Sequence, residues 1–233
     1  SIPAADYNYI DATKGGIKGL RIAYSEDWGY AAVDPEVRRV VREAVAVFER
    51  DLGCAVEKAD PGWEDPSGIF WALVVADTDL TGLRRMMKGH EREMSPHLVD
   101  LLQRPWTAEQ FTDARIGRQK ICNIMWRFMA KYDLLLTPTL AVPPFPINVQ
   151  GPEVIEGRMR HWADWLCFTF IGNMTGQPAA SIPAGLTNDG LPIGLQIIGR
   201  HLDDRTVLRA SGAFEAARPW AHKWPSLLAE LGL

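Results

Sequence analysis

The serine in the stretch TGQPAASIPAG, Ser181, is the side chain whose type and setting most directly suggest nucleophilic chemistry. A nucleophilic serine needs an exposed sharp turn, a neighbouring base and hydrogen-bond donors for the oxyanion. The elbow pattern G-x-S-x-G is absent, because Ala179 and Pro183 stand where its glycines would be. The surrounding residues are instead typical of a strand. The sequence therefore favours a structural serine over a nucleophile.

The histidines, acids and glycines offer no complete site for a metal or a phosphate group. None of the five histidines forms an H-x-x-x-H or H-E-x-x-H pattern. The stretch HLDD could seed a metal site around His201, but Asp203 is also placed to cap the helix that follows. The glycine-bearing stretches lack the spacing of a phosphate loop at a helix N-terminus. We therefore expect no metal and no cofactor.

An aromatic group is the best candidate for a surface that faces a ligand. Trp162, Trp165, Phe168 and Phe170 follow a proline-rich segment, residues 141–152. Prolines stiffen a loop and suit it to form the rim of a pocket. Small-molecule pockets combine apolar walls with a few polar groups. Packing of the same aromatic rings in the core is the alternative interpretation.

Length and composition indicate a globular protein with a sizeable core. The chain has 233 residues, of which 47% are hydrophobic and 23% are charged, and its net charge is −4. No run of Lys or Arg exceeds two residues, so we expect no nucleic-acid partner. No window of about 18 apolar residues appears, so we expect no membrane partner. Three cysteines without a CxxC pair fit a cytoplasmic protein.

The first part of the chain contains a strand–helix–strand pattern. The stretch LRIAY (20–24) is rich in β-forming residues. Asp34 can then cap a helix whose first residue is Pro35, and Gly53 can end it. CAVEKA (54–59) is a second strand. The default geometry for such a unit is a right-handed crossover between parallel strands.

Helical and strand patterns continue to alternate along the rest of the chain. Thr107 and Gln110 form a capping box, and the run YDLLLTPT is typical of a strand buried on both faces. The predicted elements are helices over 69–75, 95–104 and 107–132, a strand over 132–139, an aromatic helix over 161–174, strands over 179–185 and 194–199, and a helix over 203–218. We therefore predict an α/β fold with a mixed sheet flanked by helices, in a single domain (1–233) with an extended lead-in (1–18).

Three separated stretches resemble the amidase-signature hydrolases. They are GLRIAYSEDWGYAAVDPEV, YDLLLTPTLAVPPFP and the segment from Asn173 to Glu215, and they occur in the family's order between about Ile17 and Trp224. The resemblance implies a large mixed sheet wrapped by helices. It also implies hydrolysis or transfer of amides by a Ser–cis-Ser–Lys triad through an acyl-serine. A lysine held neutral takes a proton through the bridging serine in that scheme.

The triad itself has no counterpart among these residues. The family's glycine- and serine-rich signature, G-G-S-S-G-G-S, occurs nowhere in the 233 residues, and in the family it precedes a segment like GLRIAY. We therefore expect a C-terminal portion of an amidase-like protein, which supplies sheet and pocket wall and is inactive alone. No catalytic residue can be assigned. The candidate pocket residues are Thr137, Trp162, Trp165, Phe168 and Gln196.

Two other interpretations stay open at this point. The chain could be a non-catalytic binding or interaction module, or a subunit completed by a separate catalytic chain as its partner. It could also correspond to part of the amidase-like component of a tRNA-dependent amidotransferase. We expect a small-molecule amide as partner only in the intact parent. We also expect self-association, because truncation would expose a sheet edge and apolar surface.

Overall fold

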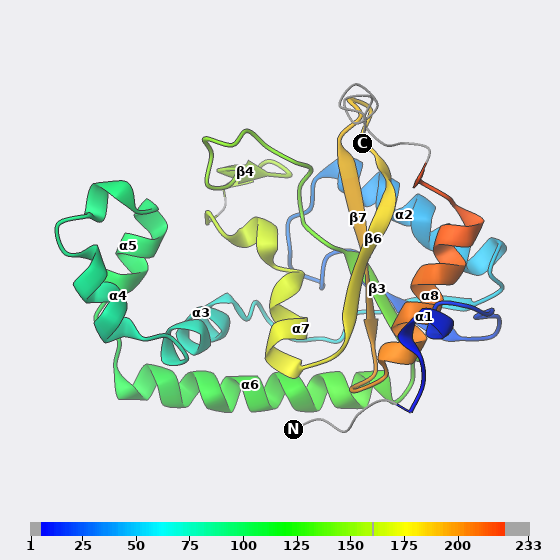
Figure 1. Cartoon of the computed structure of the whole chain (residues 1–233), viewed down its shortest axis with the longest axis horizontal. Coiled ribbons are helices and arrows are strands. Elements are labelled where there is room, and N and C mark those ends of the chain that lie inside the picture. The colour runs from blue at the N-terminus through cyan, green and yellow to red at the C-terminus, as the bar shows by residue number, and fades with distance from the viewer. Residues whose placement is uncertain (1–5, 160, 222–233) are drawn as a thin grey trace.

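A five-stranded mixed sheet forms the centre of the computed structural model, which describes residues 6–159 and 161–221 (Figure 1). The strand order is β2-β1-β3-β7-β6. β1 pairs in parallel with β2 and β3, whereas β7 runs antiparallel to β3 and β6. The strands are β1 (Arg21–Tyr24), β2 (Ala55–Lys58), β3 (Leu134–Pro138), β6 (Ala179–Leu186) and β7 (Pro192–Gly199). The predicted α/β fold with a mixed sheet and the predicted parallel pairing of the first two strands are both confirmed.

Helices flank this sheet, and a small two-stranded ribbon lies apart from it (Figure 1). The helices are α1 (Tyr9–Ala12), α2 (Pro35–Arg50), α3 (Ser67–Ala76), α4 (Leu80–Met87), α5 (Pro96–Gln103), α6 (Ala108–Met129), α7 (Thr169–Thr175) and α8 (Asp204–Ala217). Two 3₁₀ turns are η1 (Glu91–Glu93) and η2 (Asp164–Leu166), and the ribbon consists of β4 (Val154–Ile155) and β5 (Arg158–Met159).

One face of the sheet is covered by α2 and α8. The Asp34 side chain accepts a hydrogen bond from the backbone N–H of Glu36, and Pro35 occupies the first turn, as the sequence predicts. The rings of Phe48 on α2 and Phe214 on α8 stack with centroids 5.3 Å apart. Both rings are fully buried, so the two helices share one apolar layer over the strands.

The other face carries α7, with α6 running below it and α3 packed on α6 (Figure 1). The capping box is present: Thr107 Oγ1 accepts from Gln110 N, and Gln110 Oε1 accepts from Thr107 N. The helices α4 and α5 stand beyond α3, at the far end of α6 from the sheet (Figure 1). They form an arm that protrudes from the body of the protein.

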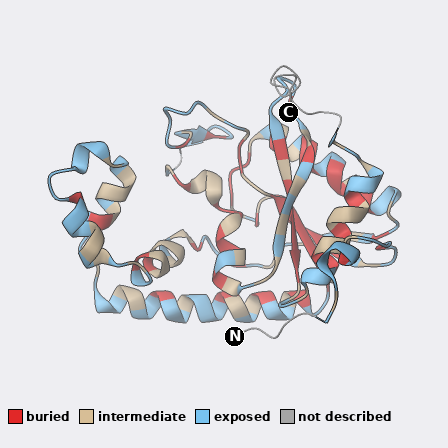
Figure 2. Cartoon of the chain, viewed as in Figure 1, coloured by how far each residue is buried: buried red, intermediate tan, exposed pale blue. Residues whose placement is uncertain are grey.

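The core centres on β3, which is buried along its whole length (Figure 2). Leu134, Leu135 and Leu136 are each 0% exposed, because helices cover both faces of this strand. Their burial confirms the buried strand predicted from the run YDLLLTPT. β6, in contrast, lies at an edge of the sheet and keeps half of its residues exposed.

The structure corrects two predictions about local structure. The aromatic helix predicted over 161–174 is instead split into η2 and α7. Tertiary contacts interrupt it, because the carbonyl of Trp165 accepts a hydrogen bond from Ala141 N at 3.0 Å. The predicted extended lead-in contains the short helix α1, since the side chain of Asn8 caps it by accepting from the N–H groups of Ile10 and Asp11.

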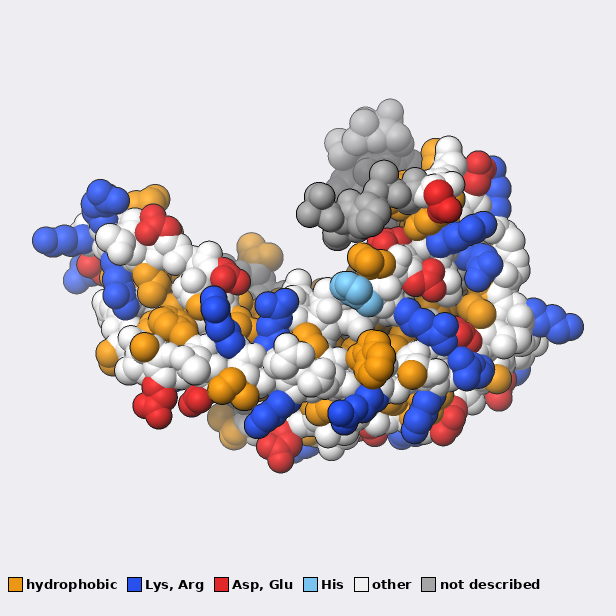
Figure 3. Space-filling model, turned by 90° about the horizontal axis from the view of Figure 1, so that it is seen from below, with side chains coloured by type: hydrophobic (Ala, Val, Ile, Leu, Met, Phe, Trp, Pro, Cys, Tyr) orange, Lys and Arg blue, Asp and Glu red, His pale blue; other side chains and the backbone are white. Residues whose placement is uncertain are grey.

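The surface along α6 carries mixed charges. Seen from below, Lys and Arg side chains alternate with Asp and Glu and with apolar side chains (Figure 3). Across the described residues, no helix combines the length and the apolar character needed to cross a bilayer.

Candidate functional site

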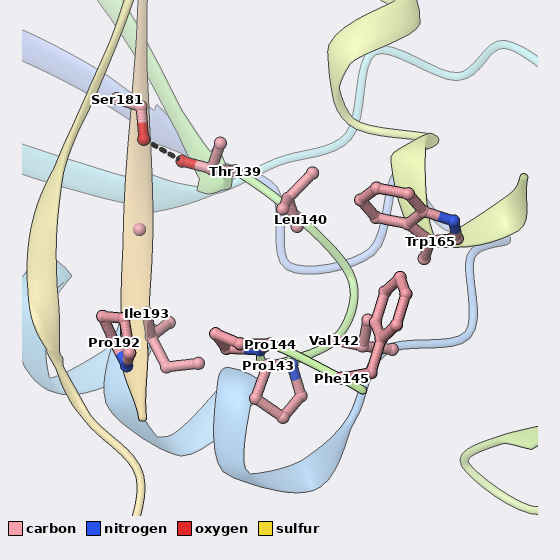
Figure 4. Close-up of a pocket in the computed structure, with 11 residues that line it drawn as sticks. Thr139, Leu140, Val142, Pro143, Pro144, Phe145, Trp165, Ser181, Pro192 and Ile193 are labelled. Carbon is pink, nitrogen blue, oxygen red and sulfur yellow. Dashed lines mark hydrogen bonds between the residues drawn. The ribbon is translucent and has the colours of Figure 1, made fainter. Parts of the chain in front are cut away.

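A cavity of about 390 Å³ lies between the proline-rich loop after β3 and the β6–β7 hairpin (Figure 4). Its size falls in the range of small-molecule pockets, about 300–1,000 Å³. Most of its wall is apolar, and prolines make that wall stiff. The apolar side chains include Val142, Pro143, Pro144, Phe145, Trp165 and Ile193. The expectation that the proline-rich segment forms a pocket rim matches this placement.

A pair of hydroxyl groups provides polar character at one end of the cavity (Figure 4). Thr139 Oγ1 and Ser181 Oγ lie 2.7 Å apart, and either can be the donor. The pair uses one of its two hydroxyl protons internally, so the other proton can be donated to a ligand. Ser181 bonds here to a hydroxyl and not to a base, which fits a structural or binding role better than that of a nucleophile.

Gly194 on β7 has no side chain, and this hydroxyl pair occupies the space where its Cβ would lie. A Cβ at Gly194 would lie 2.7 Å from Thr139 Oγ1 and 2.8 Å from Ser181 Oγ, which is too close for either oxygen. The backbone N–H of Thr139 also donates to the Gly194 carbonyl at 3.0 Å. The close approach of the two segments therefore depends on the missing side chain.

A polar row crosses three strands beside the cavity, with Gln196 and Thr137 buried and Ser181 exposed. Gln196 on β7 is opposite Thr137 on β3 and Ser181 on β6. Its Nε2 donates to Thr137 Oγ1 at 3.0 Å and to the Phe168 carbonyl at 3.1 Å. Gln196 thus joins the sheet to the start of α7, and its two amide protons are satisfied by protein partners.

The five predicted pocket residues fall into three places. Trp165 lines this cavity, edge-on to Phe145 with ring centroids 5.1 Å apart. Thr137, Phe168 and Gln196 are buried and do not line it, and Trp162 lines a second cavity nearer α5. Which of the five contacts a substrate stays a prediction.

Sequence reasoning missed Thr139, Gly194 and the hairpin residue Ile193 as pocket residues. The position of Thr139 could have indicated its role, because it directly follows the buried strand at the point where the chain leaves the core. Strand register decides which side chains of the β6–β7 hairpin face the proline-rich loop. The sequence pattern does not specify that register between strands far apart in the chain.

A network of charged side chains links α2 to the segment after β1 and to the β4–β5 ribbon. Buried Glu26 accepts hydrogen bonds from Arg42 and Arg38. The Arg38 guanidinium also donates to the carboxylates of Asp27, at 2.8 Å, and Glu156, at 3.3 Å. Burial alone would raise the pKa of Glu26, but hydrogen bonds and positive charges, chiefly those of Arg42, outweigh it and hold the pKa at about 2. The network joins α2 to the β4–β5 ribbon that follows the pocket loop.

The HLDD stretch is used for helix capping. Asp203 Oδ1 accepts from Thr206 N at 3.1 Å, and His201 Nδ1 lies 3.1 Å from the Gly176 carbonyl. Within 6–159 and 161–221, no group of three or more His, Cys, Asp or Glu side chains is arranged to hold a metal ion.

Comparison with known proteins identifies the family. The model of the family described as Amidase matches residues 1–208. This chain belongs to the amidase family. An acylamidase from Rhodococcus erythropolis is 39% identical over 97% of the chain and 48% of that protein. A glutamyl-tRNA(Gln) amidotransferase component from Geobacillus kaustophilus is 30% identical over 94% of the chain and 49% of that protein.

Solved structures agree with the family assignment. A bacterial aryl acylamidase of the amidase-signature family superposes with a TM-score of 0.85 and 29% sequence identity, over 94% of this chain and 47% of that one. The chain thus spans about half the length of the relatives it matches. The resemblance inferred from its sequence stretches is confirmed.

Proposed function

We propose that this amidase chain holds part of an amide substrate in the Thr139–Trp165 pocket of a larger amide hydrolase and does not hydrolyse amides by itself. The observation that carries the proposal is the pocket's composition: a stiff apolar wall with one hydroxyl pair at its end. Such a wall suits an apolar acyl group, whose burial contributes about 25 cal/mol per Å². The free hydroxyl proton can be donated to an oxygen of the same group.

The reacting serine would come from residues outside this chain. The relatives are about twice as long, and within the described residues the Ser181 side chain bonds to a hydroxyl and not to a base. In the intact parent, the acyl carbon would be attacked by that serine, the amine would leave, and water would release the acid. The pocket described here would orient the acyl group during both steps.

Hydrolysis is favoured over amide transfer to tRNA. The chain is 39% identical to the acylamidase and 30% identical to the amidotransferase component. The pocket wall is also mostly apolar, which suits an apolar acyl group better than a charged amino-acid substrate. Transfer of ammonia to glutamyl-tRNA, measured with the intact parent, separates the two activities.

The test compares the purified chain with its intact parent on simple aryl and aliphatic amides. We expect turnover by the parent and none by the chain. We also expect Trp165→Ala in the parent to raise KM for substrates with bulky apolar acyl groups more than for acetamide. Appreciable hydrolysis by the isolated chain would overturn the proposal, as would a parent that is inactive on every amide.

A further inference from the structure

A second and larger cavity, of about 530 Å³, lies between α3, α5 and the segment that precedes α7. It is separate from the pocket of Figure 4, because Trp165 lines that pocket while Trp162 and Asp164 line this one. The protruding α4–α5 arm contributes one wall (Figure 1). Nothing in the proposed hydrolase function uses this space.

Aromatic rings form part of the cavity wall. The indoles of Trp71 and Trp162 lie with centroids 5.4 Å apart at an angle of 40°, so their faces are not stacked in parallel. His97 from α5 stacks on Trp162 at 4.2 Å, with the ring planes only 8° apart, and this stack holds Trp162 in place. Electron-rich indole faces attract cations that come within about 6 Å of the ring centroid.

Carboxylates supply negative charge at the same cavity. Asp65, Asp100 and Asp164 line it, against one guanidinium, that of Arg104, among the described lining residues. The Arg104 guanidinium is engaged on the ring of Trp106, 4.5 Å from its centroid. Asp65 accepts from the backbone N–H of Ser67, and the exposed carboxylate of Asp100 has no hydrogen-bond or ion-pair partner within the described part of the chain.

We propose that this cavity is a binding site for an organic cation, an amine or quaternary ammonium group attached to an aromatic ring. The indoles of Trp71 and Trp162 contact the ring and the cationic head, and Asp100 attracts the charge. Aromatic walls with nearby carboxylates are suited to weakly hydrated organic cations, whereas a small metal ion would need convergent oxygen ligands. The site does not depend on hydrolysis, so it can be tested on this chain directly.

The test uses benzyltrimethylammonium as the cation, benzyl alcohol as the neutral comparator and benzoate as the anion. Binding is measured by calorimetry and by shifts of the tryptophan indole N–H signals in nuclear magnetic resonance at constant ionic strength. We expect the cation to bind, the alcohol to bind about tenfold more weakly, and benzoate weakest of all. Equal binding of cation and alcohol would overturn the proposal.

Charge variants test the site in both directions. Asp100→Asn should weaken cation binding by about threefold to tenfold, and Arg104→Gln should strengthen it. Glu49→Gln, an equivalent charge change on an exposed position of α2, should leave binding unchanged. If Asp100→Asn and Glu49→Gln have equal effects, or if Arg104→Gln weakens binding, this cavity is not the site.

A pair of tryptophan variants distinguishes the two cavities. Trp162→Leu should reduce cation binding by about tenfold, whereas Trp165→Leu, which alters the other cavity, should not. Circular dichroism checks that each variant is folded. If Trp162→Leu does not fold, the Asp100 and Arg104 variants decide the question, because both side chains are exposed. Loss of binding only in Trp165→Leu would move the ligand to the pocket of Figure 4 and contradict the proposal.

Discussion

The hydroxyl oxygens of Thr139 and Ser181 lie 2.7 Å apart, one just past the end of β3 and the other within β6. The two residues are 42 positions apart in the chain and meet because β7 pairs with both strands. This contact makes Ser181 part of a pocket wall. Substitution of either residue therefore tests whether the Ser181 hydroxyl binds a ligand or acts as a nucleophile.

Ser181→Ala should reduce kcat/KM of the intact parent by less than about tenfold, since it removes one hydrogen bond and no nucleophile. Thr139→Val should have a similar effect. The measurement is steady-state kinetics on an aryl amide. A fall of about four orders of magnitude or more in Ser181→Ala would instead identify this serine as the nucleophile.

Gly194→Ala should destabilise the chain by about 1–3 kcal/mol, because the new methyl group overlaps the hydroxyl pair. Denaturant unfolding gives the free energy. Gly16→Ala is the control, since nothing lies within 4 Å of a Cβ at that position. Equal stability of the two variants would contradict the close packing at Gly194.

Gln196→Met should lower the free energy of unfolding by about 1–3 kcal/mol. It preserves the approximate volume but removes the amide donor from the buried Thr137 hydroxyl and one of the donors from the Phe168 carbonyl. Gln119→Met on the exposed surface of α6 should change stability little. If thermal and denaturant unfolding show no difference between the variants, the buried hydrogen bonds of Gln196 do not stabilise the fold.

Glu26 should make stability depend on acid pH. Its pKa is about 2 in the folded chain and near 4.5 when unperturbed, so the unfolded state takes up a proton first as the pH falls. The stabilisation is therefore complete above about pH 5.5 and is lost as the pH drops through 4.5 toward 2. Denaturant unfolding at a series of pH values measures it.

Glu26→Gln should cost about 1.5–3 kcal/mol at pH 7 and flatten the acid limb of that profile. Glu43→Gln, which breaks only the exposed pair with Arg39, should cost less than about 1 kcal/mol. If the free energy of unfolding of Glu26→Gln falls with pH as steeply as that of the unmodified chain, other carboxylates cause the pH dependence.

Self-association should be visible by light scattering, as the exposed apolar side chains suggest. Trp126 on α6 is 73% exposed, and Trp126→Lys should shift the population toward monomer without loss of fold. The edge strand β6 contains Pro183 and a bulge, which disfavour strand-to-strand pairing. A monomer at high concentration of the unmodified chain would contradict the prediction.

Local signals predicted individual elements well. Asp34 and Pro35 start α2, and Thr107 and Gln110 start α6, both as the sequence indicates. Each signal acts between residues only a few positions apart, so neighbouring side chains and backbone groups are enough to decide it.

Local sequence signals did not predict that the aromatic segment divides into η2 and α7. The aromatic spacing favours a continuous helix over 161–174, but the Trp165 carbonyl bonds to Ala141, which the local pattern does not include. The Trp165 carbonyl therefore accepts its hydrogen bond from a distant segment and not from a residue of the same helix.

The amino-acid sequence by itself determined the alternation of strands and helices, the caps, the family resemblance and the lack of a nucleophilic elbow around Ser181. Only the tertiary structure decided that Thr139 and Gly194 meet Ser181 at a pocket while the buried Gln196 bonds to Thr137. Strand order and register determine which side chains meet, and they follow from packing between segments far apart in the chain.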